Sequence, residues 1–360
     1  MGSLANGLAV PSQFALRQTL PAGAQFGDGA GQEQPLCAAF EQAGSFDIER
    51  FETFGEFHCG SPAGDSRFFH IQRNILIIES PLEIITFYET CDAYLKQKGH
   101  HDDPQARMTT TEVFTATLVA AWFFGNNLRV ACATLAEMGV VPQMLSESRF
   151  CRRRQKITSE DWQAILTLLS ERFPADTFAV DSCPVPVCHK RRAKRSRLYR
   201  DANNAYWGYC AAKDDYYYGL KAHTIVAASG RPVEVLLLCG CSADLTGLKE
   251  MLLALPPGSK VYADKAYSDY GYEDRLKAER QIELLPLRKP NLKRQHPEAV
   301  AKALSRGRKR IETTFSQIAA KLPRRIHAIT AASFESKILA TFVAFAILTA
   351  ANEKKQTVGG

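Results

Sequence analysis

Three carboxylates in the sequence stand where they could hold a divalent cation. Asp181 follows the apolar run TFAV, Asp264 follows KVYA, and Glu312 lies in the basic segment RGRKRIETTFSQI. Open α/β sheets place their functional groups at the carboxyl ends of strands. If the two strands are neighbours, Asp181 and Asp264 reach one edge of the sheet, and a cation would offset the cost of two adjacent carboxylates.

Such oxygen donors favour Mg²⁺ or Mn²⁺. Two ions about 3.5–4 Å apart suit phosphoryl transfer, because one activates the attacking oxygen and the other stabilises the leaving oxygen. Simpler explanations exist for each acid. An aspartate often begins a turn after a strand, and Glu312 could pair with Arg308 one helical turn earlier. The repeated strand-and-acid pattern favours the cation site, but the residues alone leave both explanations open.

The segments around these acids predict an α/β region over residues 174–350. Its first strand is predicted at 176–182, and two further strands, YYYGLKAHTIVAA and RPVEVLLLCG, are predicted to join at the turn Ser229–Gly230. Strands ending at Asp264 and Leu287 alternate with helices, which favours a mixed sheet flanked by helices. A basic helix over 298–320 carries Glu312, and an apolar helix follows at 333–350.

An all-helical region is expected over residues 81–173. Thr109 and Glu112 form the pattern of a capping box at the start of one helix. Two short helices around a turn at Pro142 resemble a helix-turn-helix that would contact DNA through Arg149, Arg152, Arg153 and Arg154. The alternative is a helical bundle with one solvated basic face.

The two ends of the chain are predicted to lie outside these regions, as a poorly structured leader at 1–80 and a tail at 351–360. Residues 1–80 carry no lysine, four arginines and nine acids, whereas the whole chain has a net charge of +7. A basic working part with an unrelated leader is expected from this asymmetry.

Composition and apolar runs argue against a secreted or membrane-spanning protein. The longest runs, ATLVAAWFFG and ILATFVAFAILTA, are shorter than the roughly 20 residues needed to cross a bilayer. No secretory signal pattern is present, so the expected location is the cytoplasm and the ten cysteines are expected to be reduced. A zinc site at Cys183, Cys188 and His189 lacks a second pair of ligands.

Further basic residues predict contacts with DNA phosphates. The segment HKRRAKRSRLYR, residues 189–200, contains seven basic residues and no acid. It includes the predicted contacts Lys190, Arg191, Arg192, Lys194 and Arg195. A solvated loop is the alternative. The nearby Tyr199, Tyr206, Trp207 and Tyr209 could stack on exposed bases or belong to the core.

Several single residues near the acids also have candidate roles. Lys221 and His223, in GLKAH, are predicted to lie near Asp181 and contact DNA, although a buried strand histidine is the alternative. Asp244 is interpreted as a helix N-cap or a supporting acid of the site. Lys265, next to Asp264, is predicted to neutralise charge or contact DNA.

Four blocks of the sequence, in order, resemble bacterial insertion-sequence transposases with a DDE triad. They are FAVDSCPVPVC, YYYGLKAHTIV, GSKVYADKAY and RKRIETTFSQI. The resemblance covers about residues 81–350 and is nearest to the family numbered 982 among insertion sequences, whose catalytic domains are RNase H-like. It implies that Asp181, Asp264 and Glu312 are the catalytic acids and hold two Mg²⁺ or Mn²⁺ ions.

The resemblance also implies partners and a reaction. The expected activity is cleavage of double-stranded DNA at transposon ends and strand transfer by the freed 3′-hydroxyl, with a homodimer in the DNA complex and no membrane. Arg308 matches an arginine of the family, but Ser305 and Ala319 stand where relatives often have a tyrosine and a lysine. Lys321, two residues after Ala319, is assigned as a DNA contact although it does not match the position of that lysine. The alternatives are another RNase H-like nuclease and an inactive DNA-binding descendant.

Overall fold

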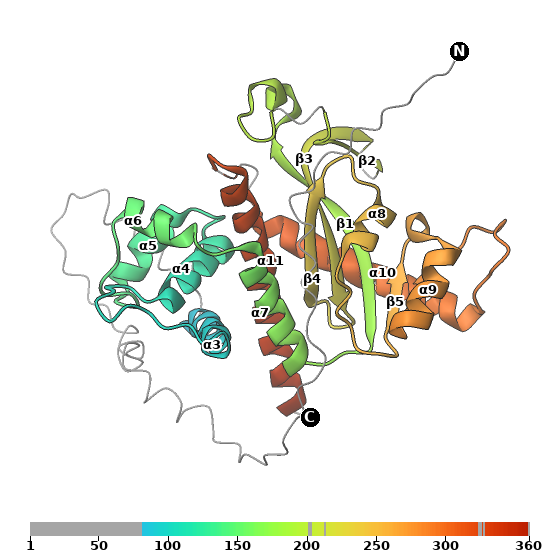
Figure 1. Ribbon diagram of the computed structural model, residues 1–360, viewed down its shortest axis with the longest axis horizontal. Coiled ribbons are helices and arrows are strands. Elements are labelled where there is room, and N and C mark those ends of the chain that lie inside the picture. Colours follow the sequence, from blue (N-terminus) through green and yellow to red (C-terminus); the bar gives the residue numbers. More distant parts are fainter. Residues whose placement is uncertain (1–80, 201–203, 212–213, 323–325, 327, 359–360) are drawn as a thin grey trace. The chain divides into compact units, whose positions relative to one another are not determined.

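The computed structural model describes residues 81–358 apart from 201–203, 212–213, 323–325 and 327; the leader predicted at 1–80 lies outside the described residues. A group of helices precedes the sheet (Figure 1). These helices are α3 (Pro81–Gln97), α4 (Thr110–Phe123), α5 (Leu128–Glu137), α6 (Glu147–Arg154) and α7 (Ser159–Arg172). The Thr109–Glu112 capping box at the start of α4 is confirmed.

Six strands form one mixed sheet. They are β1 (Thr177–Cys188), β2 (Trp207–Cys210), β3 (Asp215–Ala227), β4 (Pro232–Cys239), β5 (Lys260–Ala263) and β6 (Glu283–Pro286). The order is β2-β3-β1-β5-β6, with β4 also paired to β3. The predicted hairpin of β3 and β4 is confirmed, as is the parallel pairing expected of a βαβ unit, here β5 and β6. The fold is RNase H-like.

Both faces of this sheet carry helices, as predicted. They are α8 (Asp244–Glu250), α9 (Tyr270–Arg280), α10 (Glu298–Lys321) and α11 (Ala331–Val358). Phe178 and Val180 of β1 share a core cluster with residues of α8 and α9. Ala179 lies on the opposite face and packs with Ile311 of α10. Alternation along β1 therefore decides which helix each side chain meets.

Helix α11 connects the helical region to the sheet. It contacts α3, α4 and α7 on one side and β4 and α10 on the other (Figure 1). It continues to Val358, beyond the predicted end at residue 350, so residues 351–358 belong to a helix and not to a tail. The boundary predicted between residues 173 and 174 therefore does not separate two independent cores.

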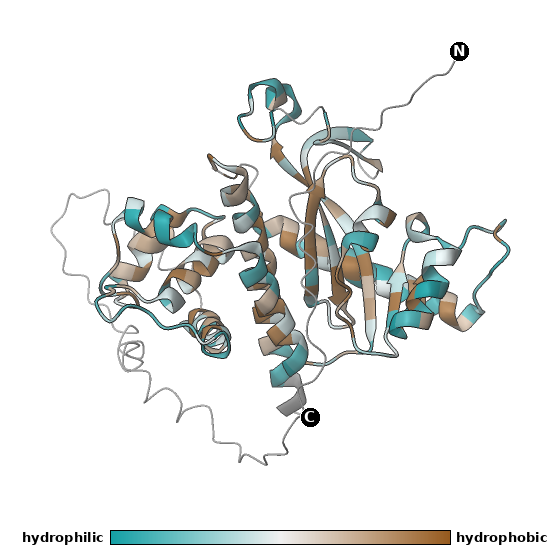
Figure 2. Cartoon of the chain, in the orientation of Figure 1, coloured by the Kyte–Doolittle hydropathy of each residue, from teal (hydrophilic) through white to brown (hydrophobic). Residues whose placement is uncertain are grey.

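By length and composition, residues 331–355 of α11 could cross a membrane, which the shorter apolar run had not indicated. Within that helix, 72% of the most apolar window is buried inside the protein. Phe334, Ile338 and Phe342 are fully buried. These contacts are those of a core helix, and Figure 2 shows hydrophobic residues concentrated on α11 and the central strands.

The length of β1 was not predicted. The strand runs to Cys188, so Asp181 lies within it and not at its end. The residues beyond Asp181 include Pro184 and Pro186, which cannot donate to a ladder. They are tolerated because β5 pairs only with residues 177–180 of β1. Beyond that point this side of β1 pairs with no described strand, and β3 alone continues the ladder.

Candidate active site

Asp181 and Asp264 lie side by side, as the sequence predicted. The parallel pairing of β1 with β5 ends at Val180 opposite Ala263, so the next residue of each chain segment is an aspartate. Ala179 and Tyr262, two residues before the acids, both belong to the cluster under α10. Alternation then places both carboxylates on the face of the sheet that α10 covers.

Helix α10 brings Glu312 to this face. Ile311 packs on β1 and β3, and Gly307 lies so close to β5 that an added Cβ would stand 2.7 Å from the Tyr262 ring. Arg310 and Thr314 donate hydrogen bonds to the carbonyls of Ser229 and Gly230 in the β3–β4 turn. These contacts fix the rotation of α10.

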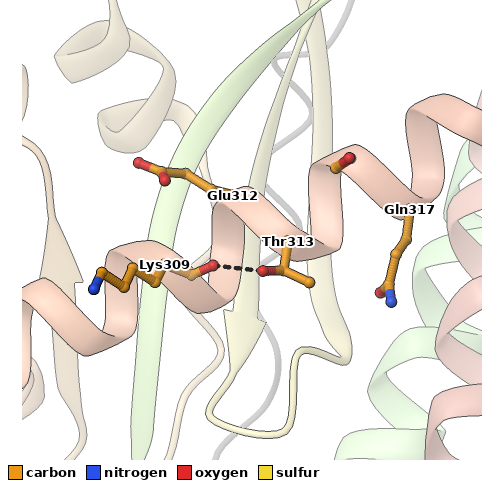
Figure 3. A pocket seen from close by; sticks show the side chains of 5 residues that line it. Lys309, Glu312, Thr313 and Gln317 are labelled. Atoms are coloured by element: carbon orange, nitrogen blue, oxygen red, sulfur yellow. Dashed lines mark hydrogen bonds between the residues drawn. The ribbon is translucent and has the colours of Figure 1, made fainter.

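Glu312 remains exposed to solvent on α10. It borders an open pocket of about 500 Å³ together with Lys309, Thr313, Ser316 and Gln317. Figure 3 shows its carboxylate extending away from the side of the helix that carries Thr313 and Gln317. A carboxylate in this position can meet a ligand without first losing a protein partner other than Arg308.

Arg308 links two of the three acids. Its guanidinium lies 3.6 Å from Asp264 Oδ1 and 3.4 Å from Glu312 Oε1. The simpler explanation of Glu312, an i,i+4 salt bridge, is therefore present. Among the residues that the structure describes, no three His, Cys, Asp or Glu side chains converge closely enough to hold a metal ion. The guanidinium supplies positive charge between Asp264 and Glu312.

Asp181 occupies the least balanced environment of the three acids. Burial raises the pKa of Asp181 to about 6, and repulsion by Asp244 and Asp264 adds to that rise. The Ser182 backbone N–H, which donates to Asp181 Oδ1 at 2.8 Å, and the charge of Arg308 oppose it. At neutral pH the carboxylate is ionised and poorly compensated, which is the condition in which a cation binds favourably.

Asp244 supports the site from the opposite face of the sheet. Ser182, next to Asp181 in β1, donates its hydroxyl hydrogen bond to Asp244 Oδ1 at 2.6 Å, and the Lys221 ammonium lies 3.4 Å from the same oxygen. Asp244 is the first residue of α8, and Ala243 is the N-cap, so the N-cap interpretation was wrong. Its bonds to Ser182 and Lys221 agree with the supporting role.

His223 does not reach the surface. Its side chain is 0% exposed and lies under α8, where a Cβ added to Gly247 would stand 2.2 Å from the imidazole Nδ1. Burial lowers its pKa to about 4, so the ring is neutral at physiological pH. The predicted DNA contact by His223 is therefore wrong, because α8 packs directly over the ring. The Lys221 ammonium is also occupied by protein partners, since it donates a hydrogen bond to the Ser242 carbonyl at 2.8 Å.

The predicted DNA-binding arginines of the helical region separate into two groups. Arg149 and Arg152 are exposed on α6. Arg153 donates to the Met108 carbonyl and Asp102, and Arg154 is 2% exposed and donates to Ser333 and Ser336 of α11. Arg153 therefore ties α6 to the loop before α4, and Arg154 ties α6 to α11. A solvated basic face accounts only for Arg149 and Arg152.

The other residues predicted to contact DNA also divide into exposed cations and cations engaged with protein groups. All five cations of the 3₁₀ helix η3 (Lys190–Arg195) are exposed: Lys190, Arg191, Arg192, Lys194 and Arg195. Lys190 forms an ion pair with Asp215, and Lys321 lies 4.0 Å above the Trp122 ring. Lys265 is exposed beside Asp264. Thus η3 and Lys265 are open to a ligand, whereas Lys321 is partly engaged.

Two comparisons bear on this arrangement. Residues 172–347, just under half of the chain, match the model of a family described as the transposase DDE domain. No curated protein matches the chain. The matched stretch contains β1, β5 and α10, the three elements that carry Asp181, Asp264 and Glu312.

Proposed function

We propose that the chain cleaves DNA at transposon ends and joins those ends to target DNA. Residues 172–347 match the model of the transposase DDE domain, which supports this proposal. The observation that carries this proposal is the juxtaposition of Asp181 and Asp264 on the α10 face of the sheet, with Glu312 on that helix. The four sequence blocks further support a likeness to the insertion-sequence family numbered 982.

The chemistry of the three acids fits Mg²⁺ or Mn²⁺, because carboxylate oxygens are the ligands that these hard cations prefer. In the described arrangement the three side chains do not converge closely enough to hold an ion, so binding would have to draw them together and displace Arg308. Asp181, Asp264 and Glu312 would hold the ions. When bound, two such ions would activate the attacking oxygen and stabilise the leaving oxygen of the phosphodiester. This assignment accounts for an ionised carboxylate at Asp181 that its protein neighbours repel.

The chain's own residues would position the DNA strand. Arg308 lies between Asp264 and Glu312, so its guanidinium can move from these acids to a phosphate oxygen when cations take its place. Lys265 and the exposed cations of η3 would bind phosphates further along the strand. In this role the double-stranded ends of the element and the target are the partners, and a homodimer would hold two ends in the cytoplasm.

The test is cleavage of DNA carrying the element's ends by the full chain with Mg²⁺. Asp264→Asn is expected to lower the cleavage rate on the order of 10³-fold or more, because it removes a ligand of the reacting centre, while DNA affinity stays unchanged. Glu312→Gln should behave similarly. Glu298→Gln is the matched control, since Glu298 lies exposed on the same helix.

Equal activity of the Glu312 and Glu298 variants would remove Glu312 from the catalytic site. Loss of DNA binding along with cleavage in Asp264→Asn would count against a catalytic role for that residue. Formation of joined products separates a transposase from a nuclease that only cuts. Binding without any cleavage by the wild-type chain would identify an inactive descendant.

A further inference from the structure

Strands β2 and β3 carry a ladder of aromatic side chains on one face. Trp207 pairs in register with Tyr218, and Tyr209 pairs with Tyr216. The ring centroids are 5.5 Å apart in the first pair and 5.2 Å apart in the second. Because residues two apart in a strand share a face, the two pairs form one continuous ladder.

The outer pair of this ladder is open to solvent. Tyr218 is 6% exposed, whereas Tyr209 is 48% and Tyr216 is 62% exposed. Tyr209 lies on β2, at the end of the sheet order, and Tyr216 lies on the neighbouring strand β3. Edge strands are usually protected by charged side chains or coverage, so an uncovered aromatic pair there indicates a surface that meets a partner.

The ring of Tyr209 is held in place by a polar contact. Its hydroxyl donates a hydrogen bond to Asp214 Oδ1, and the Tyr216 backbone N–H donates to Asp215 Oδ1. Asp215 also accepts from the Lys190 ammonium of η3. Both acids near the ladder are therefore engaged with neighbouring groups, and the last contact ties η3 to the start of β3.

Positive charge surrounds the ladder on the η3 side. Of the exposed cations of η3, Lys190 pairs with Asp215, whereas Arg191, Arg192, Lys194 and Arg195 form no ion pair with an acid of the described residues. Figure 2 shows η3 as hydrophilic. A polyanion with flat apolar faces would match both features, because its charges would meet η3 and its faces would meet the tyrosines.

We infer that the Tyr209–Tyr216 pair and η3 form a surface that binds unpaired nucleotides of DNA, with bases stacked on the rings and phosphates on η3. This inference rests on the proposed function, which makes DNA the substrate. A base in a duplex hides its flat faces between its neighbours, so only an unpaired base can stack on the tyrosines. The surface therefore selects a melted or frayed strand.

The experiment measures binding of the full chain without divalent cations, so that no cleavage occurs. One probe is an oligothymidine of about 20 nucleotides, longer than the ~4–16 nucleotides that single-strand modules cover. The other is a blunt duplex. Tyr209→Ala with Tyr216→Ala should weaken oligothymidine binding about tenfold or more and leave duplex affinity within about twofold.

Two matched variants separate stacking from structure and from charge. Tyr209→Phe with Tyr216→Phe keeps the rings and should retain oligothymidine affinity, while removing the Tyr209 bond to Asp214. Lys194→Ala with Arg195→Ala should weaken both probes and reduce the dependence of affinity on salt by ~0.7 per lost single-strand phosphate contact. A fluorescent 2-aminopurine placed in the oligothymidine should be quenched by wild type and by the Phe variant only.

The inference is overturned if Tyr209→Ala with Tyr216→Ala weakens binding of the oligothymidine and of the duplex equally. It is also overturned if this variant retains oligothymidine affinity and 2-aminopurine quenching. Thermal melting shows whether the Ala variant is folded, and the Phe variant supplies the test if it is not. Wild-type chain that binds neither probe overturns the proposed function as well. Single-strand binding through the tyrosines without Mg²⁺-dependent cleavage would overturn the proposed function alone.

Discussion

Folding removes the charged side chains of Arg154 and Asp181 from water, but the groups around the two charges differ. Burial lowers the pKa of Arg154, and its guanidinium is met by the hydroxyls of Ser333 and Ser336. Burial raises the pKa of Asp181, and Asp244 and Asp264 raise it further. The fold supplies two hydroxyl partners for the first charge, despite the nearby Lys337 ammonium, and two repelling carboxylates for the second.

This difference separates a structural charge from one that awaits a ligand. Arg154 joins α6 to α11 through hydrogen bonds that already exist, so its charge contributes to stability within the chain. Asp181 receives one backbone hydrogen bond and the influence of Arg308, which leave its ionised form poorly compensated. A cation from solution would provide the missing attraction.

The largest effect on stability is expected at the α6–α11 contact. Arg154→Ala should lower the free energy of unfolding by about 2–3 kcal/mol, because it removes two buried hydrogen bonds and the packing of the side-chain stem. Arg152→Ala, on the exposed side of α6, should change it by less than about 0.5 kcal/mol. Urea unfolding measures both, and equal effects would show that Arg154 is not structural.

The second effect concerns pH and the cation. Between the ordinary value of 3.8 and the raised value of about 6, folded Asp181 holds a proton that the unfolded chain releases. The free energy of unfolding of the metal-free chain therefore falls as pH rises through this window, and binding of Mg²⁺ must displace the proton. Mg²⁺ affinity should rise about tenfold per pH unit below pH 6 and level off above it.

Titration calorimetry of the full chain at several pH values measures that affinity. Asp181→Asn should flatten the pH dependence of both stability and Mg²⁺ binding, since the amide cannot titrate. An unchanged pH dependence in this variant would show that another group controls the cation. Asp92→Asn is a matched control, because Asp92 forms a surface ion pair with Lys96 on α3.

The smallest effect on Mg²⁺ affinity is expected from Asp244, on the opposite face of the sheet. Asp244→Asn should lower Mg²⁺ affinity by about tenfold, because residues that orient a metal ligand typically contribute 10–100-fold. Ser182→Ala should have a similar effect, because it removes the hydrogen bond to Asp244. Asp269→Asn, at the N-cap of α9, is the control for general destabilisation. Loss of Mg²⁺ affinity in that variant too would argue against a specific role for Asp244.

The sequence allowed those features to be predicted that depend on short segments. The capping box at Thr109, the turn at Ser229–Gly230 and the apolar runs that each precede an aspartate are local patterns. The adjacency of Asp181 and Asp264 followed because parallel strands end at one edge of a sheet. The basic helix that carries Glu312 was also predicted, over residues 298–320.

The features that could not be predicted depend on partners far along the chain. Arg154 is buried because Ser333 and Ser336 lie more than 170 residues later in α11. His223 is covered because α8 has a glycine at residue 247. Asp244 meets Ser182 only once the sheet has formed. The exposed Tyr216 gave one local signal, its alternation with Tyr218 in YYYG, but its openness depends on the short β2 strand.

The position of α11 also bears on the order of events during synthesis. Helices α3, α4 and α7 bury apolar side chains against α11, which leaves the ribosome well after them. Translation at about 5–20 residues per second separates α7 from α11 by roughly 10–30 s. During that interval the helical region lacks one wall of its core. A nascent chain therefore cannot complete the core around α3, α4 and α7 until α11 has also been made.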